Sequence, residues 1–350
     1  MTARSGKNSR DLAFEKASAF FAFVVLFLAA LLFAVLLRES MPALRKFGAA
    51  FLVTGTWDPV LEKFGALPFI YGTLVSSFLA ILIALPLSVG AAIFINEFAP
   101  PWMKTPVSFL AELLAAIPSV IYGLWGIFVL VPILRDVFMK PVTKYLGWVP
   151  LFKGPVYGPS MLAAGVLLSI MIIPFILSVS REVLATVPQR QKEAVLSLGG
   201  TRWEMLRIVI GQHCIPGIFG ATILGLGRAL GETMAVTMVI GNRPEALLSL
   251  FQPGYSMAAV IANEFTEAVG DVYLSSLVLV GLILFAMTFA VNLAAKGILT
   301  KMVARASLLI HNHNKNKTLA GFFFTNIKPM YYDLFYHNCN CADTKIRVGC

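Results

Sequence analysis

The chain has few of the residues that usually carry enzyme chemistry. Among 350 residues there are four histidines and four cysteines, and His213 is the only histidine before residue 300. Three of the cysteines, Cys339, Cys341 and Cys350, lie close to the C-terminus. Their Cys-x-Cys spacing is not typical of zinc sites, which place two or more residues between paired cysteines. We therefore predict no catalytic centre, no metal site and no cofactor.

A phosphate-binding loop is missing as well. No G-x-x-x-x-G-K-[ST] motif occurs, so the chain is not predicted to hydrolyse ATP in the P-loop manner. Charged residues make up only 13%, against 58% hydrophobic residues. The net charge of +10 does not indicate a nucleic-acid partner, because most positive residues lie beside long apolar runs. This composition excludes a soluble domain and is typical of a protein in a lipid bilayer.

Six apolar runs are long enough to cross a bilayer, which takes about 20 helical residues. They are approximately Ala17–Leu37, Phe69–Ile95, Val107–Leu134, Ser160–Val179, Ile215–Ile240 and Leu274–Ala295. The first run is too long for a signal-peptide core and is interpreted as a retained anchor. We predict an all-α polytopic membrane protein with six transmembrane helices.

The loops between the runs predict orientation and domain organisation. Lys and Arg are nearly balanced between the two sets of loops, and Lys296, Lys301 and Arg305 tip the balance toward both termini in the cytoplasm. The expected organisation is a cytoplasmic segment 1–16, a transmembrane domain 17–296 and a cytoplasmic tail 297–350. The polar, biased composition of the tail predicts disorder.

The cytoplasmic segment 181–213 carries helix signals. Two pairs fit the S/T-x-x-E/Q capping box, namely Thr186 with Gln189 and Thr201 with Glu204. Between the two predicted helices, Gly199 and Gly200 can adopt the positive φ that ends a helix. Short helices exposed at a membrane face can dock in a partner's groove, so we interpret this segment as a coupling loop. The alternative is a solvated connector.

The third run contains a proline near its middle. Pro118 removes one helical hydrogen bond and leaves a carbonyl oxygen free. Two interpretations are open for Ser119 and Tyr122. Either they satisfy this carbonyl in a kinked helix, or they line a polar path for a substrate.

The fifth run carries an arginine near its middle. An unpaired arginine there costs about 2.5–3.5 kcal/mol on insertion scales, so Arg228 must face protein or water. Glu232 lies at i+4 and can share its helix face. One interpretation is a structural salt bridge; the other is that Arg228 donates to an oxyanion. Glu232 would then accept a hydrogen bond from protonated phosphate, which sulfate cannot donate. Gly227 and Gly231 form a G-x-x-x-G pair that admits a neighbouring helix.

These residues resemble known families. Glu193-Ala194-Val195 with Gly199 resembles the EAA loop of permease subunits of bacterial ABC importers. Three blocks, Gly65–Thr73, Glu112–Gly126 and Gly225–Val236, more narrowly resemble the PstC permeases of the phosphate-specific importer. The similarity runs from about Trp57 to Asn292. The family loop usually closes on Leu-Pro, where this chain reads Gly211-Gln212.

The resemblance implies a type I ABC importer permease bundle in the bacterial inner membrane, working by alternating access. It also implies a PstA-like sister permease, two PstB-like ATP-binding subunits, an extracytoplasmic PstS-like phosphate-binding protein and inorganic phosphate as substrate. By position, the docking residues for the ATP-binding subunits would be Glu193, Ala194, Val195, Gly199 and Gly200. Arg228 and Glu232 would belong to the phosphate pathway.

The expected function is therefore a transport subunit without enzyme activity, with ATP hydrolysed by partners. One alternative is an importer of another oxyanion or small solute on the same scaffold. A second is a secondary transporter or channel, which would be expected to show internal repeats that are not clear here. A purely structural membrane subunit is the last alternative.

Overall fold

The computed structural model describes residues 9–316, and this part of the chain is helical, without a β-strand. An isolated bridge pairs Asp58 with Lys63. The chain divides into two units, 1–296 and 297–350, which are described separately. The helices before the last span are α1 Ser9–Glu39, α2 Met41–Phe47, α3 Ala50–Val53, α4 Leu67–Ile93, α5 Pro101–Ala116, α6 Ser119–Trp125, α7 Val131–Ile133, α8 Lys140–Leu146, α9 Met161–Ala185, α10 Gln189–Ser197, α11 Arg202–Met205, α12 Gly211–Gly231, α13 Met234–Ile240 and α14 Met257–Glu264.

Short π-helical stretches join several of these helices. They are η1 Phe94–Phe98 after α4, η2 Gly126–Leu130 and η3 Leu134–Met139 around α7, and η5 Leu206–Ile210 before α12. The 3₁₀ turn η4, Pro150–Phe152, precedes α9. The last helix, α15 Asp271–Asn316, runs from the first unit into the second.

Six helical runs among the described residues are long and apolar enough to cross a membrane, which confirms the predicted fold class. They are Ala13–Glu39, Leu67–Phe98, Ser119–Leu146, Met161–Ala185, Cys214–Gly231 and Asp271–Lys301. The third and fifth differ most from the predicted runs, because the chain breaks at Pro118 and again after Gly231.

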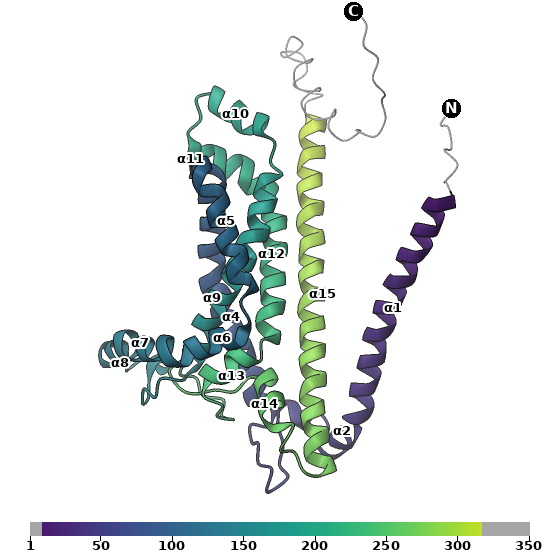
Figure 1. The fold of residues 1–350 in the computed structure, drawn as a ribbon, viewed down its shortest axis with the longest axis vertical. Helices are drawn as coiled ribbons and strands as arrows, with labels where there is room; N and C mark the ends of the chain where they lie inside the picture. The colour runs from purple at the N-terminus through teal and green to yellow at the C-terminus, as the bar shows by residue number, and fades with distance from the viewer. Residues whose placement is uncertain (1–8, 317–350) are drawn as a thin grey trace, which may run out of the picture. The chain divides into compact units, whose positions relative to one another are not determined.

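The centre of the first unit is the packing of α4 against α9, with α12 beside them (Figure 1). The two helices approach closely at Gly165, where a Cβ atom would lie 2.7 Å from Leu79 Cβ. Farther along, the buried Ser88 hydroxyl donates to the Ile173 carbonyl oxygen at 3.2 Å. This agrees with the packing role that small residues usually have between membrane helices. α9 is the most buried of the six runs and serves as the scaffold for the others.

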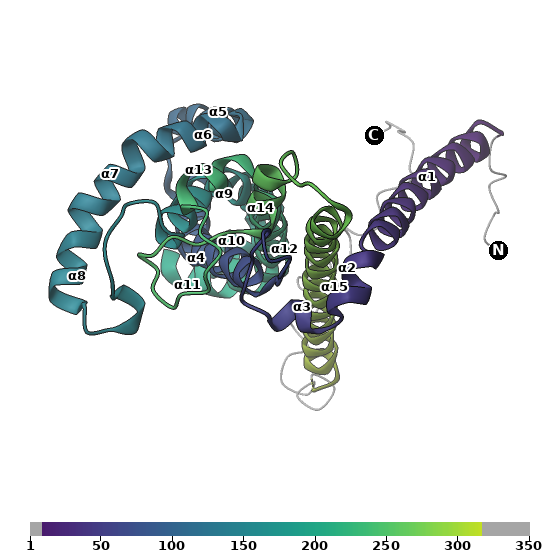
Figure 2. The same ribbon diagram turned by 90° about the horizontal axis from the view of Figure 1, so that it is seen from below.

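The third predicted span is divided at Ile117 and Pro118. Both residues have extended backbone, so α5 ends at Ala116 and α6 begins at Ser119. α5 packs alongside α9, whereas α6 to α8 continue as an arc around the opposite end of the bundle (Figure 2). The expected kink is therefore a complete break. Helices α4 and α9 continue through Pro86 and Pro174, so the break follows from the extended backbone of Ile117, which a following proline favours.

The end of the bundle that carries α13 and α14 is fixed by a carboxylate among aromatic rings. Glu264 accepts hydrogen bonds from the Trp57 indole and the Tyr273 hydroxyl, each at 2.7 Å. It lies at the end of α14, which the buried Ser256 side chain caps at its start. This arrangement ties the loop after α3 to the beginning of α15.

In the second unit, residues 297–316 continue α15 as a helix, although the change of composition predicted disorder from 297. Residues that favour helix, such as Leu299 and Ala304, follow the span and support its continuation. The rest of the predicted tail, including Cys339, Cys341 and Cys350, lies outside the described residues.

Candidate functional site

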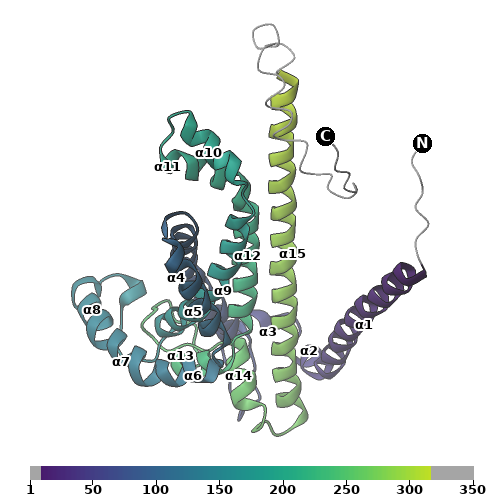
Figure 3. The same cartoon turned by 45° about the horizontal axis from the view of Figure 1, so that its top comes forward.

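The predicted coupling loop forms two short helices, α10 and α11, beyond the ends of α9 and α12 (Figure 3). Thr201 caps α11 as predicted. Its hydroxyl accepts from the Glu204 amide at 3.3 Å, and the Glu204 carboxylate accepts from the Thr201 amide at 2.7 Å. These hydrogen bonds to the charged form lower the pKa of Glu204. Gly199 has φ of +83° in the turn between the helices, whereas Gly200 does not need a positive φ.

The other predicted capping box, Thr186 with Gln189, is wrong. α9 continues to Ala185, and Thr186 terminates it by donating its hydroxyl to the Val183 carbonyl oxygen at 2.7 Å. α10 instead begins directly after Pro188, without a side-chain cap. The physical reason is Pro188, which disfavours helical backbone at the residue before it and so moves the helix start to Gln189.

The outer surface of the coupling loop mixes charge with exposed apolar side chains. Glu193 and Ala194 are exposed on α10, and Val195 is half-buried. Leu198 and Trp203 are 89% and 72% exposed. On the inner side, Met205 and Leu206 are buried against the ends of the spans.

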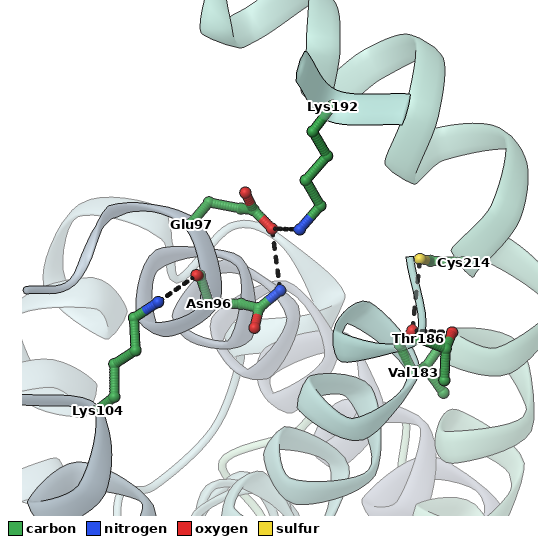
Figure 4. Close-up of polar contacts among 7 residues, drawn as sticks. All are labelled: Asn96, Glu97, Lys104, Val183, Thr186, Lys192 and Cys214. Carbon is green, nitrogen blue, oxygen red and sulfur yellow. Dashed lines mark hydrogen bonds and ion pairs between the residues drawn. The ribbon is translucent and has the colours of Figure 1, made fainter. Parts of the chain in front are cut away.

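A buried ion pair, which the sequence reasoning missed, holds α10 to the bundle. Lys192 Nζ lies 2.5 Å from Glu97 Oε1, and the two side chains are only 9% and 10% exposed. Glu97 belongs to η1 at the end of α4, 95 residues away in sequence. The Asn96 side-chain amide donates to the same Glu97 oxygen at 2.9 Å (Figure 4). The coupling loop is thus connected to the second span as well as to the two spans that flank it.

The fifth predicted span ends between its two charged residues. α12 stops at Gly231, Glu232 and Thr233 lie between helices, and α13 starts at Met234. The predicted sharing of one helix face by Arg228 and Glu232 is therefore wrong, and no ion pair joins them. Instead, Glu232 Oε1 accepts from the Ala235 amide at 3.4 Å, near the start of α13. A carboxylate is favoured there by the partial positive charge of a helix N-terminus.

Arg228 is left without an acidic partner among the described residues. Its side chain is exposed in the isolated chain, and its guanidinium lies 5.9 Å from the centre of the Phe175 ring on α9. A cation over an aromatic face gains a modest attraction, well short of a paired charge.

Tyr122 satisfies the carbonyl that the proline frees. Its hydroxyl donates to the Leu114 oxygen at 2.9 Å, and Leu114 is the residue four positions before Pro118. This is the first of the two interpretations given for Tyr122, with the helix broken instead of kinked. Ser119 begins α6, is half-buried and takes no part in this hydrogen bond. The described residues contain no cluster of three or more ligands suited to a metal ion.

Comparisons with known proteins show the family to which the chain belongs. Residues 84–305 match the family model described as binding-protein-dependent transport system inner membrane component. The phosphate transport system permease protein PstC of Mesorhizobium japonicum is 48% identical over 274 residues, covering 77% of this chain and 84% of that protein. The Haemophilus influenzae protein of the same name is 45% identical, covering 83% of this chain and 93% of its own length.

Among solved structures, the inward-facing MetNI methionine ABC transporter aligns with a TM-score of 0.46 at 20% identity. The alignment covers 68% of this chain and 94% of that one. The family match and the sequence relatives extend over most of the spans described above. The chain belongs to the PstC family of binding-protein-dependent transport system inner membrane components, and is a multi-pass inner membrane protein that functions with other subunits of an ABC importer.

Proposed function

We propose that this chain is the permease subunit of an ATP-driven phosphate importer. The relatives at 48% and 45% identity are named phosphate transport permeases. The observation that carries the proposal is Arg228: an exposed guanidinium, without an acidic partner in the described part of the chain, at the point where the fifth span breaks. Its five N–H donors form a fork suited to the oxygens of phosphate.

Glu232 is proposed to distinguish phosphate from sulfate. It lies four residues beyond Arg228, in the break between α12 and α13, and is half-buried. A carboxylate accepts a hydrogen bond from the proton of hydrogen phosphate, whereas fully ionised sulfate has no proton to donate. Because Glu232 is not occupied in an ion pair with Arg228, an anion does not have to displace it in order to bind the guanidinium.

A homologous sister permease is proposed to cover the free face of α12. Gly220, Gly227 and Gly231 have open space where a Cβ atom would lie. No other helix among the described residues therefore covers these positions of α12. Small residues on a membrane helix let a second helix approach closely. A helix of the sister subunit on this face would place Arg228 at the boundary between the two permeases, where a translocation path can open.

The coupling loop is proposed to dock an ATP-binding subunit in the cytoplasm. Glu193, Leu198 and Trp203 form an exposed surface of mixed charge and apolar character on α10 and α11. With α10 and α11 in the cytoplasm, both termini are cytoplasmic as well, and the end of the bundle with α13 and α14 faces an extracytoplasmic phosphate-binding protein. Motion of the ATP-binding subunit would pass through Lys192 and Glu97 to α4, and through α9 and α12 to Arg228.

The experiment is transport by the reconstituted complex. The chain is co-expressed with its sister permease and ATP-binding subunits, and proteoliposomes are given the phosphate-binding protein outside and ATP inside. We expect ATP-dependent uptake of phosphate and negligible uptake of sulfate. Equal uptake of the two anions, or uptake without ATP, would contradict the proposal.

A further inference from the structure

An open cavity of about 390 Å³, with charged, hydroxyl and apolar side chains in its walls, lies at the end of the bundle that carries α10 and α11. It lies between η1, the first turns of α5 and the last turns of α9. Its walls include two cations, Lys104 and Arg181, and two hydroxyl groups, those of Thr105 and Ser108. The residues assigned above to the substrate path do not line it, so it is separate from that path.

The two cations lack the negative charges that usually accompany half-buried positive groups. Both side chains are half-buried, and neither forms an ion pair with any described residue. Glu182 also lines the cavity, yet it is exposed and pairs with neither cation. Lys104 Nζ donates one hydrogen bond, to the Asn96 carbonyl oxygen at 2.8 Å, and has two further protons to donate. Two positive groups without an acidic partner in one open cavity attract an anion.

We propose that this cavity binds a phosphoryl group. A tetrahedral phosphoryl group offers several oxygens to the Arg181 fork and to the Lys104 ammonium, with the Thr105 hydroxyl beside them. The Ser108 hydroxyl donates to the Lys104 carbonyl oxygen at 2.5 Å. Two sources share this chemistry, the headgroup of an anionic lipid and free inorganic phosphate.

The position of the cavity brings a lipid headgroup within reach. It lies where the spans of α4 and α9 end, next to Trp102, which is 74% exposed at the start of α5. Exposed aromatic rings are enriched at the membrane surface, and basic pockets between membrane helices bind lipid headgroups there. A second, smaller pocket shares Ile95, Ser108 and Arg181 with this cavity, and its other lining residues are Ala111, Leu177 and Ser178.

The site is connected to the coupling loop by a short chain of polar contacts (Figure 4). Asn96 accepts from Lys104 through its backbone and donates to Glu97 through its side chain, and Glu97 pairs with Lys192 on α10. An anion that draws Lys104 toward itself therefore acts on the segment that holds α10. Binding in the cavity and the position of α10 are therefore linked. Only the assignment of the α10 and α11 end of the bundle to the cytoplasm rests on the proposed function.

The test measures binding directly, so it does not depend on transport. The purified full-length chain is titrated with dioctanoyl phosphatidylglycerol, with dioctanoyl phosphatidylcholine and with inorganic phosphate, while its melting temperature is recorded. The variant Lys104→Gln/Arg181→Gln is compared with Lys296→Gln/Lys301→Gln, which removes the same charge from exposed positions outside the cavity. We expect the cavity variant to bind phosphatidylglycerol at least about tenfold more weakly than the control variant, as for the loss of a charge-assisted contact.

The outcomes distinguish the two sources of the phosphoryl group, an anionic lipid and free inorganic phosphate. Stabilisation by phosphatidylglycerol alone identifies a lipid site, and stabilisation by inorganic phosphate identifies a site for the free anion. If both variants respond as the wild type does to all three additives, the proposed site is overturned. Amide hydrogen exchange of Gln189–Ser197 with and without the bound additive tests the link, and exchange that stays the same would overturn the link while leaving the site in place.

Discussion

At the scale of single residues, Tyr122 replaces a hydrogen bond that Pro118 removes. We predict that Tyr122→Phe lowers the free energy of unfolding by about 1 kcal/mol, because the Leu114 oxygen then keeps only a long contact to the Ile117 amide, at 3.4 Å. Thermal melting in detergent measures this change. Phosphate uptake by the complex should remain near the wild-type rate. A large loss of uptake with unchanged stability would instead favour a role for Tyr122 in the substrate path.

The charged residues of the fifth span show what sequence spacing alone can predict. An arginine in an apolar run indicated a site that must face water or protein, and Arg228 is exposed in the isolated chain. The predicted position of Glu232 on the same helix face as Arg228 was wrong. An i, i+4 argument holds only if the helix continues, and α12 ends at Gly231. Glycines at 217, 220, 225 and 227 lie inside α12 without ending it, so the sequence does not single out Gly231.

At the scale of elements, the Lys192–Glu97 pair fixes α10 against η1. We predict that Glu97→Gln lowers the free energy of unfolding by about 3–5 kcal/mol, because it leaves a lysine charge buried without a partner. Denaturant or thermal unfolding of the purified chain is the measurement. As a control, Glu97→Leu with Lys192→Met removes both charges together and should cost much less. If the double variant is as unstable as the single one, the pair does not act as a unit.

The capping box of α11 makes the start of this helix sensitive to acid. Hydrogen bonds from Thr201 lower the pKa of Glu204 in the folded chain below its ordinary value. Its contribution to folding is therefore fully present above that ordinary value and is lost as the pH falls through the lowered pKa. We predict faster amide exchange of residues 202–206, after correction for intrinsic rates, below about pH 4.

Glu204→Gln provides the control for this pH effect, since glutamine keeps the shape of the capping box but does not titrate. Exchange in that variant should be independent of pH over the same range. A pH dependence as large as that of the wild type would show that another group is responsible.

Local signals predicted some elements and failed where tertiary contacts decide. The Thr201–Glu204 box and the positive φ of Gly199 were predictable, because each depends on residues close in sequence. The ion pair of Lys192 with Glu97 was not, since its residues lie 95 positions apart and each alone resembles an ordinary surface charge. The cavity lined by Lys104 and Arg181 could not be predicted either, because its walls come from segments that are far apart in sequence.

At the scale of the whole molecule, the coupling loop is proposed to connect this chain to an ATP-binding subunit. We predict that Glu193→Lys abolishes co-purification of that subunit without changing the melting temperature of the chain, because Glu193 is exposed and makes no contact that supports the fold. Glu267→Lys makes the same charge change at an exposed position near the opposite end of the bundle and should leave the complex intact. Retention of the subunit by Glu193→Lys would argue against docking at this surface.

The number and approximate position of the spans could be predicted, because apolar runs of the required length admit few other structures. The path of the chain at Pro118 could not. Hydropathy alone does not show that α5 ends at Ala116 and that α6 to α8 follow a separate path at one end of the bundle. The packing of α6 against α9 and α13 determines the path of the chain after Pro118.

The most direct test of the account is phosphate uptake by the reconstituted complex carrying Arg228→Gln. We predict that uptake is lost by at least about a hundredfold, as expected when a charge-assisted contact to the anion is removed, while the complex assembles normally and melts at the wild-type temperature. Arg228→Lys should retain part of the activity, because it keeps the charge but not the fork of donors. Wild-type uptake by Arg228→Gln would contradict the central claim that this guanidinium receives the transported anion.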